Sequence, residues 1–253
     1  MGPQRRLCSI ERRRDAELTA TPEGIPLGQR QNYLPEKLKG GLHVIEQHAE
    51  AQRYALSFTS GALLMREAAI IAPIYLRERD WARVRTVVAG ENLLQARTVA
   101  SGLRLAREVI QRLTVLTDDE IKILIEATST ERGHLMWTAA CRRYDFIGEF
   151  AEEVVRERFL LLTPTLTHDD FDSFVRSKSL WHTELAELTD STRRKLRSNL
   201  FRMLKEAGLL SSSGHIQQAM MSQRVATALA AHAPNDLRFF PTNNAVTSGR
   251  AQP

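Results

Sequence analysis

The stretch WHTELAELTDSTRRKLRSNLFRMLKEAGLLSS, residues 181–212, predicts a short helix, a tight turn and a longer helix rich in cations. The turn Thr189-Asp190-Ser191-Thr192 can cap the second helix, because side-chain oxygens accept from the unpaired N–H groups at a helix start. After this cap, the apolar residues fall on one stripe of a helix with 3.6 residues per turn. They are Leu196, Leu200, Met203, Leu204 and Ala207.

The opposite side of this predicted helix carries cations. No Asp or Glu occurs between Ser191 and Lys205, so these cations are not interleaved with acids. Such a face suits a polyanion such as DNA or RNA, and a helix-turn-helix presents its second helix in this way. The alternative is a surface helix whose basic face is only solvated. The residues on this face are Arg194, Lys195, Ser198, Arg202 and Lys205.

A glycine that can end the helix and a turn-rich loop follow this second predicted helix. Gly208 is suited to end it. Leu209-Leu210 followed by Ser211-Ser212-Ser213-Gly214 predicts the start of a small β-wing. Strand-like alternation is otherwise almost absent, so we expect a mainly α fold.

The composition limits the class of protein, its compartment and its partners. The 253 residues are 43% hydrophobic and 26% charged, which is ordinary for a globular protein. The net charge of +5 is too small to establish a nucleic-acid partner by itself. The two cysteines, Cys8 and Cys141, cannot form a disulfide framework, and we expect a reducing, cytoplasmic location. No apolar run approaches the roughly 20 residues that span a bilayer, so no membrane partner is expected.

The pattern along the chain divides it into four parts. Residues 1–54 predict a disordered or loosely attached extension, because they are rich in Pro and Gly and lack sustained periodicity. Residues 55–162 predict a helical module, and Thr163-Pro164-Thr165 interrupts the helical pattern after it. Residues 163–241 predict a winged-helix-like module, and residues 242–253 a polar tail. Expected helices include 81–89, 92–113, 146–162, 168–178 and 216–231.

The helical module repeats the helix-turn-helix theme in a weaker form. A helix over Trp81–Ala89 and a turn with Gly90 precede the helix predicted at 92–113. Apolar residues from Val99 to Leu113 are expected to face inward, Leu103 among them. The outward side would carry Arg97, Ser101, Arg104, Gln111 and Arg112, interrupted by Glu108. A helical bundle with a merely solvated outer face explains this pattern equally well.

Catalytic and metal-binding patterns are weak. His168-Asp169-Asp170 resembles part of a metal site, but acids at a helix start more often stabilise the first turn. His134 and Cys141 share a helical face, as a Cys/His nucleophile pair would, but the neighbouring Trp137 and Tyr144 favour a place in the core. Arg142 and Arg143 beside the thiol could lower its pKa. Phosphate-binding glycine motifs and a nucleophile elbow are missing from the sequence. We therefore expect no catalysis, no cofactor, no metal and no small-molecule substrate.

Several segments together resemble the BrxA family, the small helical component of bacteriophage-exclusion (BREX) defence systems. The resemblance covers about residues 55–241, and the run CRRYDFIGEFAEEVVRERF within 134–159 is its most specific part. The other segments are LSFTSGALL (56–64), ENLLQARTVASGLRLAREVIQRL (91–113) and STRRKLRSNLFRMLKEAGLL (191–210). The resemblance implies a cytoplasmic, helical DNA-binding protein without known catalytic activity, acting beside other BREX components.

The leading hypothesis is a DNA-binding accessory protein that mostly contacts phosphates of double-stranded DNA, with weak sequence specificity. Two alternatives stay open: a protein–protein scaffold whose basic faces dock on acidic partners, and an RNA-binding regulator. The family resemblance does not identify the contacting residues, so these come from the helical faces. The candidates are Arg193, Arg194, Lys195, Arg197, Ser198, Arg202 and Lys205, with Arg97, Ser101 and Arg104 in the first module.

Overall fold

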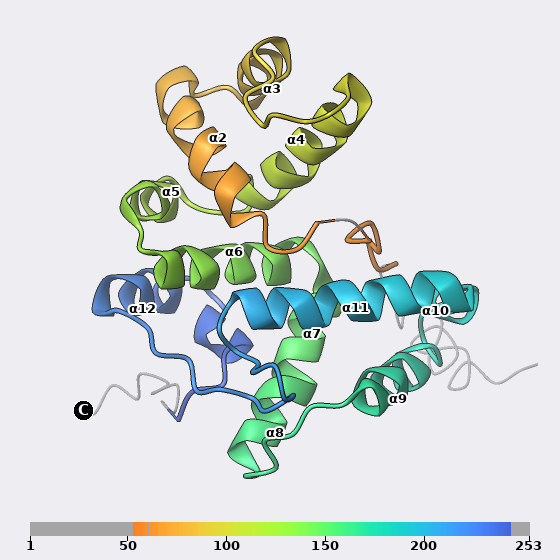
Figure 1. The fold of residues 1–253 in the computed structure, drawn as a ribbon. Coiled ribbons are helices and arrows are strands. Elements are labelled where there is room, and N and C mark those ends of the chain that lie inside the picture. Colours follow the sequence, from red (N-terminus) through yellow and green to blue (C-terminus); the bar gives the residue numbers. More distant parts are fainter. Residues whose placement is uncertain (1–52, 60, 244–253) are drawn as a thin grey trace, which may run out of the picture. The chain divides into compact units, whose positions relative to one another are not determined.

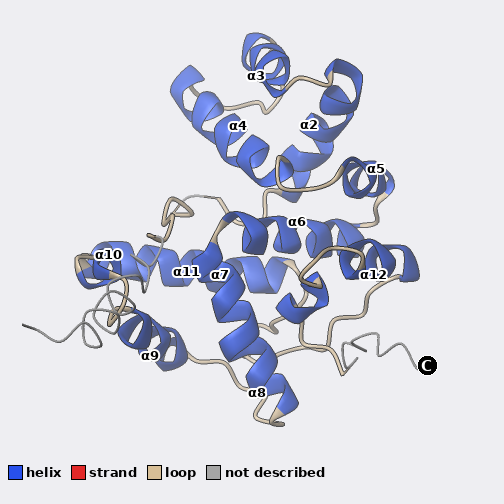
Figure 2. Ribbon diagram, turned by 180° about the vertical axis from the view of Figure 1, so that it is seen from behind, coloured by secondary structure: helices blue, strands red, loops and turns tan. Residues whose placement is uncertain are grey.

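The computed structural model describes residues 53–59 and 61–243, and these residues are mainly helical (Figure 1, Figure 2). This confirms the predicted all-α class. Within these ranges β pairing is limited to two isolated bridges, Thr165–His215 and Leu210–Ile216. The helices are α2 (Met65–Glu78), α3 (Trp81–Gly90), α4 (Val99–Leu113), α5 (Asp118–Glu126), α6 (Ser129–Arg143), α7 (Asp145–Phe150), the π-helical η1 (Ala151–Arg156), α8 (Glu157–Leu160), α9 (His168–Lys178), α10 (Thr183–Ala186), α11 (Asp190–Glu206), α12 (Gln223–Ala230) and the 3₁₀ turn η2 (Asp236–Phe239).

Threonine side chains start most of the long helices. Thr117 accepts from the Glu120 N–H, and the Glu120 carboxylate accepts from the Thr117 N–H in return. Thr128 begins α6 in the same reciprocal way, and Thr167 does so at α9 with Asp170. Each such pair satisfies two N–H groups that the helix leaves unpaired. The His168-Asp169-Asp170 run is therefore a helix start, as predicted.

Helix α6 forms the centre of the core. Every residue from Gly133 to Cys141 is buried, and α6 contacts α2, α4, α5, α7, α11, α12 and η2. Figure 1 shows α6 crossing between α2 and α4 on one side and α11 on the other. The middle of α6 is mostly small or apolar on all sides, with His134 and Thr138 buried among these residues, so other elements must cover it all round. Its Trp137 ring donates from Nε1 to the Phe239 carbonyl at 3.0 Å, which anchors η2.

Two expected surface charges lie in this core instead. Arg112 is fully buried, and its Nη2 meets Glu108 Oε1 at 2.9 Å. The Tyr144 hydroxyl donates to the same oxygen at 2.6 Å. The prediction that Arg112 and Glu108 lie on an outward face was wrong, because the two side chains neutralise each other and can be buried together.

The predicted helix at 92–113 begins late. Residues 92–98 form a loop, and α4 starts at Val99 with Thr98 as its cap. The Ala96 N–H donates to Asn92 Oδ1 at 3.1 Å, which offers this loop an alternative to helix. Val99 is 79% exposed and Leu103 is 49% exposed, so the prediction that these two face inward was wrong.

The predicted helix at 216–231 also begins late, at Gln223. The residues before it are extended. Ile216 N–H donates to the Pro164 carbonyl at 2.6 Å, Gln217 N–H donates to the Leu209 carbonyl at 2.9 Å, and Ala219 N–H donates to the Pro241 carbonyl at 3.0 Å. Pro164 and Pro241 lie far away in sequence, so local periodicity could not reveal these two bonds.

An aromatic cluster spans the predicted boundary at 163–165. The Phe146 ring lies 5.8 Å from Phe171 and 5.3 Å from Phe174, and Phe150 lies 5.9 Å and 5.3 Å from the same two rings. Phe146 and Phe150 come from α7, while Phe171 and Phe174 come from α9. The division at 163 stays a prediction, but the two modules share this part of the core.

The outer parts of the chain fall mostly beyond the described ranges. The predicted extension 1–54 and tail 242–253 lie outside them, apart from Arg53, Tyr54, Thr242 and Asn243. Tyr54 is buried and donates from its hydroxyl to Glu149 Oε2 at 2.6 Å. Thr242 is buried too. The ordered core therefore includes the ends of both predicted flanking segments.

Replacing Phe146 by Ala should lower the free energy of unfolding by about 3–5 kcal/mol, because a buried ring is removed from between α7 and α9. Urea denaturation followed by circular dichroism measures this change. Leu161→Ala is the control, since Leu161 is 70% exposed and its truncation should change stability by less than about 0.5 kcal/mol. Equal effects of the two substitutions would contradict the shared aromatic core.

Candidate nucleic-acid interface

Helix α11 has the predicted buried stripe. Leu196, Leu200, Met203, Leu204 and Ala207 are all buried, which confirms the face assignment. Phe201 is buried as well and meets the His168 ring edge-on at 5.1 Å. Thr189 caps the helix by accepting from the Thr192 N–H. The buried stripe fixes which side of α11 faces outward.

The outward side carries the predicted cations. Arg194, Lys195, Ser198, Arg202 and Lys205 are all exposed. Arg202 meets Glu206 Oε1 at 3.0 Å, an exposed i,i+4 pair that is worth little. In the part of the chain that the structure describes, Arg194, Lys195 and Lys205 form no ion pair with a carboxylate. Their charge is therefore available to an external anion.

Two further predicted contacts lie off this face. Arg197 Nη1 pairs with Asp172 Oδ2 at 2.6 Å, and only 20% of the Arg197 side chain is exposed. Arg193 is half-buried. The structure thus sets Arg197 between α11 and α9 rather than on the exposed cationic face, and a groove contact by Arg197 would require this pair to open.

A shallow depression of about 380 Å³ lies over the first half of α11. Asn199 is one of its lining residues and donates from Nδ2 to the Phe58 carbonyl at 2.9 Å. This bond ties the 53–59 segment to α11 and brings Thr59 to the depression. Sequence reasoning missed Thr59, because no local pattern links it to a helix so distant in the chain. The lining residues are Thr59, Ser191, Arg194, Lys195, Ser198 and Asn199.

The chain after α11 folds back as a small hairpin. Gly208 has φ of 71° and ends the helix in a left-handed conformation, which glycine adopts without strain. Ser211 N–H donates to the His215 carbonyl at 2.8 Å, and Leu166 N–H donates to the Gly214 carbonyl at 2.8 Å. The predicted wing region is thus a turn held by a few backbone bonds, without regular strands. A winged-helix assignment stays a prediction.

The helix before α11 is shorter than the helix-turn-helix pattern suggested. Helix α10 contains only Thr183–Ala186, and its first turn follows His182. The next full helix back along the chain is α9, which contacts α10. A helix-turn-helix interpretation would therefore consist of α9, the single turn α10, and α11.

The second predicted DNA-binding site, in the helical module, is less continuous than the basic face of α11. Arg97 and Arg104 are exposed, but Arg97 lies in the loop before α4 and not on a helix. The Ser101 hydroxyl is engaged in capping, because it donates to the Thr98 carbonyl at 2.8 Å and accepts from the Thr98 N–H at 3.2 Å. These three residues do not form a continuous cationic face like that of α11.

The histidine and cysteine of α6 are core residues. His134 and Cys141 are both buried, and His134 meets the Phe240 ring edge-on at 5.6 Å. Burial raises the pKa of the Cys141 thiol, so the neighbouring arginines do not produce a reactive thiolate. Burial also lowers the pKa of His134. This geometry fits packing and not nucleophilic chemistry.

Other classes of site find little support in residues 53–59 and 61–243. Among them, no group of His, Cys, Asp and Glu side chains could hold a metal ion. Within the same ranges, no helix is long and apolar enough to cross a membrane.

Comparison with known proteins places the chain in a family. The BrxA family model matches residues 52–233. The chain belongs to the BrxA family. BREX protein BrxA of Escherichia coli O9:H4 is 28% identical over 152 residues, covering 60% of this chain and 71% of that protein. BREX protein BrxA of Paramagnetospirillum magneticum is 25% identical over 164 residues, covering 64% and 81%.

A solved crystal structure supports the fold. An uncharacterized protein from Magnetospirillum magneticum matches with a TM-score of 0.65 and 22% identity. The match covers 75% of this chain and 98% of the other. At this identity the likeness establishes the fold alone. The resemblance predicted from the sequence is thus confirmed at the level of family and fold.

Burial of Cys141 predicts a slow reaction with thiol reagents. In a Cys8→Ser variant, Cys141 is the remaining cysteine of the two in the chain. Its labelling by a chromogenic disulfide reagent at neutral pH should be on the order of a hundredfold slower in the folded chain than in denaturant. Burial keeps the reagent away from the sulfur and lowers the fraction of the thiol that is ionised. Equal rates in the folded and denatured chains would contradict a structural role.

Proposed function

We propose that the chain is a non-catalytic DNA-binding component of a BREX defence system that grips double-stranded DNA through the exposed face of α11. Membership of the BrxA family supports the defence setting, since the curated relatives are BREX proteins. The observation that carries the DNA assignment is the row of exposed cations on α11 opposite its buried stripe. Such a protein would act in the cytoplasm, beside the other BREX components.

The charge arrangement on α11 suits phosphates better than base edges. Arg194 and Lys195 stand one turn from Ser198, and Arg202 and Lys205 continue the face. Cations that neutralise phosphates release condensed counterions, which makes affinity fall steeply with salt. The amide of Asn199, the side chain in α11 best suited to reading adenine, is already engaged with Phe58. We therefore infer weak sequence specificity.

The depression over α11 offers a natural place for a backbone phosphate. Arg194 and Lys195 supply charge there, and Thr59, Ser191 and Ser198 supply hydroxyl donors. Because Thr59 is held in place by the Asn199–Phe58 bond, this donor is preorganised and not recruited on binding. The hairpin at Ser211–His215 follows α11 directly and could contact the neighbouring backbone, as a wing does.

Two groups with strongly shifted pKa values, Glu131 and Tyr144, have structural roles, which fits a function without catalysis. Hydrogen bonds from Arg224 and Ser222 lower the pKa of Glu131, which caps α6. Burial and a hydrogen bond to Glu108 raise the pKa of Tyr144 to about 12. Shifted pKa values can mark catalytic sites, but here they are explained by a helix cap and a core hydrogen bond.

Reversing two charges on α11 should weaken DNA binding. For Arg194→Glu with Lys205→Glu, we expect the affinity for random-sequence duplex DNA to fall at least about tenfold at moderate salt. The slope of log affinity against log salt should also fall by about one for each phosphate that is no longer neutralised. Fluorescence anisotropy across a salt titration measures both quantities.

A matched control separates this surface from net charge. Arg77→Glu with Lys122→Glu changes the total charge by the same amount on α2 and α5, where both side chains are exposed. The control should keep nearly the affinity and slope of the unaltered chain. If both double variants behave alike, α11 is not the binding surface. Preferential competition by duplex RNA would instead favour an RNA-binding regulator.

A further inference from the structure

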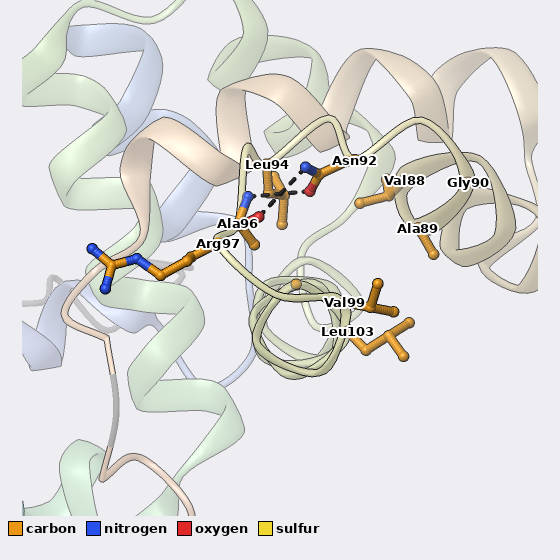
Figure 3. A pocket seen from close by; sticks show the side chains of 10 residues that line it. Val88, Ala89, Gly90, Asn92, Leu94, Ala96, Arg97, Val99 and Leu103 are labelled. Carbon is orange, nitrogen blue, oxygen red and sulfur yellow. Dashed lines mark hydrogen bonds between the residues drawn. The ribbon is translucent and has the colours of Figure 1, made fainter.

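A second surface lies at the far end of the first module, between α3 and α4. The end of α3, the 92–98 loop and the start of α4 enclose a groove of about 290 Å³ (Figure 3). Val88, Ala89 and Gly90 line it from α3, and Val99 and Leu103 line it from α4. Figure 3 shows the Val99 and Leu103 side chains next to one another at this groove.

The apolar stripe of α4 is buried in the second half of the helix and exposed in the first half. Ala106 and Ile110 lie on the same helical face as Val99 and Leu103, by the helical spacing of 3.6 residues per turn. Ala106 and Ile110 are buried, whereas Val99 is 79% exposed and Leu103 is 49% exposed. Half of one amphipathic stripe is therefore left without a cover among the described residues.

Hydrogen bonds and close packing hold the 92–98 loop that forms one wall of the groove. The Asn92 side chain accepts from the Ala96 N–H at 3.1 Å and donates to the Ala96 carbonyl at 3.4 Å, which closes the loop on itself. Gly102 allows this loop to approach α4, because a Cβ there would lie 3.2 Å from the Ala96 Cβ. A loop held in this way forms a receptor surface without folding on binding.

Cations surround the exposed stripe. Arg97 lines the groove, and Arg104 and Arg107 are exposed on α4 just beyond Leu103. Arg85 is exposed on α3, one turn before Ala89. Glu91 is the exposed acid of the adjoining loop. In the described ranges, Arg97, Arg104 and Arg107 form no ion pair, so an apolar stripe with a basic border faces outward.

Other occupants fit this border less well. Residues 1–52 contain eight Lys and Arg against seven Asp and Glu, so they lack the excess of acid that would complement it. A second copy related by twofold symmetry would set the arginines of one groove against those of the other. DNA would satisfy the arginines but would leave Val99 and Leu103 facing charged phosphates.

We propose that the α3–α4 groove is a docking site for an acidic amphipathic helix of a partner protein. The apolar residues of that helix would cover Val99 and Leu103, and its carboxylates would meet Arg97, Arg104 and Arg107. Helices bind grooves in this mode through apolar anchors spaced three or four residues apart. This surface is separate from the α11 face, so the chain would hold DNA and a partner protein at different sites.

In-cell photo-crosslinking tests the docking site. A photoreactive phenylalanine analogue replaces Leu103 in the full chain, in cells that carry its complete defence system, and the crosslinked peptide is identified after nuclease treatment. We expect it to contain apolar residues at helical spacing and an excess of Asp and Glu. The same analogue at exposed Thr130, on the first turn of α6, is the position control and should not capture that peptide.

Gly90→Trp places a bulky ring at the groove, and a Cβ at Gly90 meets no atom within 4 Å; circular dichroism checks that the variant keeps its helical fold. This variant should reduce the Leu103 crosslink about tenfold or more and leave duplex DNA binding unchanged. The α11 double reversal should do the opposite, which separates failure of this proposal from failure of DNA binding. A crosslink to DNA, to a second copy, to residues 1–52 or to a non-acidic segment overturns the proposal, as does the absence of any crosslink.

Discussion

The close approach of α6 and α11 at Gly133 determines how the basic face of the protein is presented. A Cβ at Gly133 would lie 3.3 Å from the Glu206 carbonyl oxygen and 3.5 Å from the Ala207 Cα. A side chain at this position would be tight against the backbone of α11, which would have to shift by a few tenths of an ångström to accommodate it. Once that contact forms, Leu200 and Leu204 must face inward, and Arg202 and Lys205 must face outward.

The same contact organises the chain before α2. Glu206 accepts from the Leu63 N–H at 2.9 Å, and Asn199 donates to the Phe58 carbonyl at 2.9 Å. Two polar residues of α11 thus hold the 53–59 segment and the start of α2 in place. Thr59 reaches the depression beside Arg194 for this reason. The candidate phosphate site is therefore a product of tertiary structure, even though its cations all come from one helix.

Sequence periodicity was sufficient where one helix face meets one core. The stripe of α11 and the cation row opposite it could be predicted, because both depend only on helical spacing. Helical spacing could not show that the rest of the protein covers only the second half of the apolar stripe of α4. Val99 and Leu103 were therefore expected to be buried together with Ile110. Spacing also could not show that Arg112 and Glu108 neutralise each other in the core, since charge alone indicates an outward face. Thr59 was missed because its place depends on one hydrogen bond between distant segments.

Lysine footprinting on the unaltered chain tests the proposed DNA-binding face of α11 most directly. Acetylation of Lys195 and Lys205 is measured by mass spectrometry with and without saturating duplex DNA, and Lys122 on α5 serves as the internal reference. We predict that DNA protects Lys195 and Lys205 at low salt, that high salt removes this protection, and that Lys122 reacts equally throughout. Unchanged labelling of Lys195 and Lys205 in the presence of bound DNA would contradict a DNA-binding role for this face.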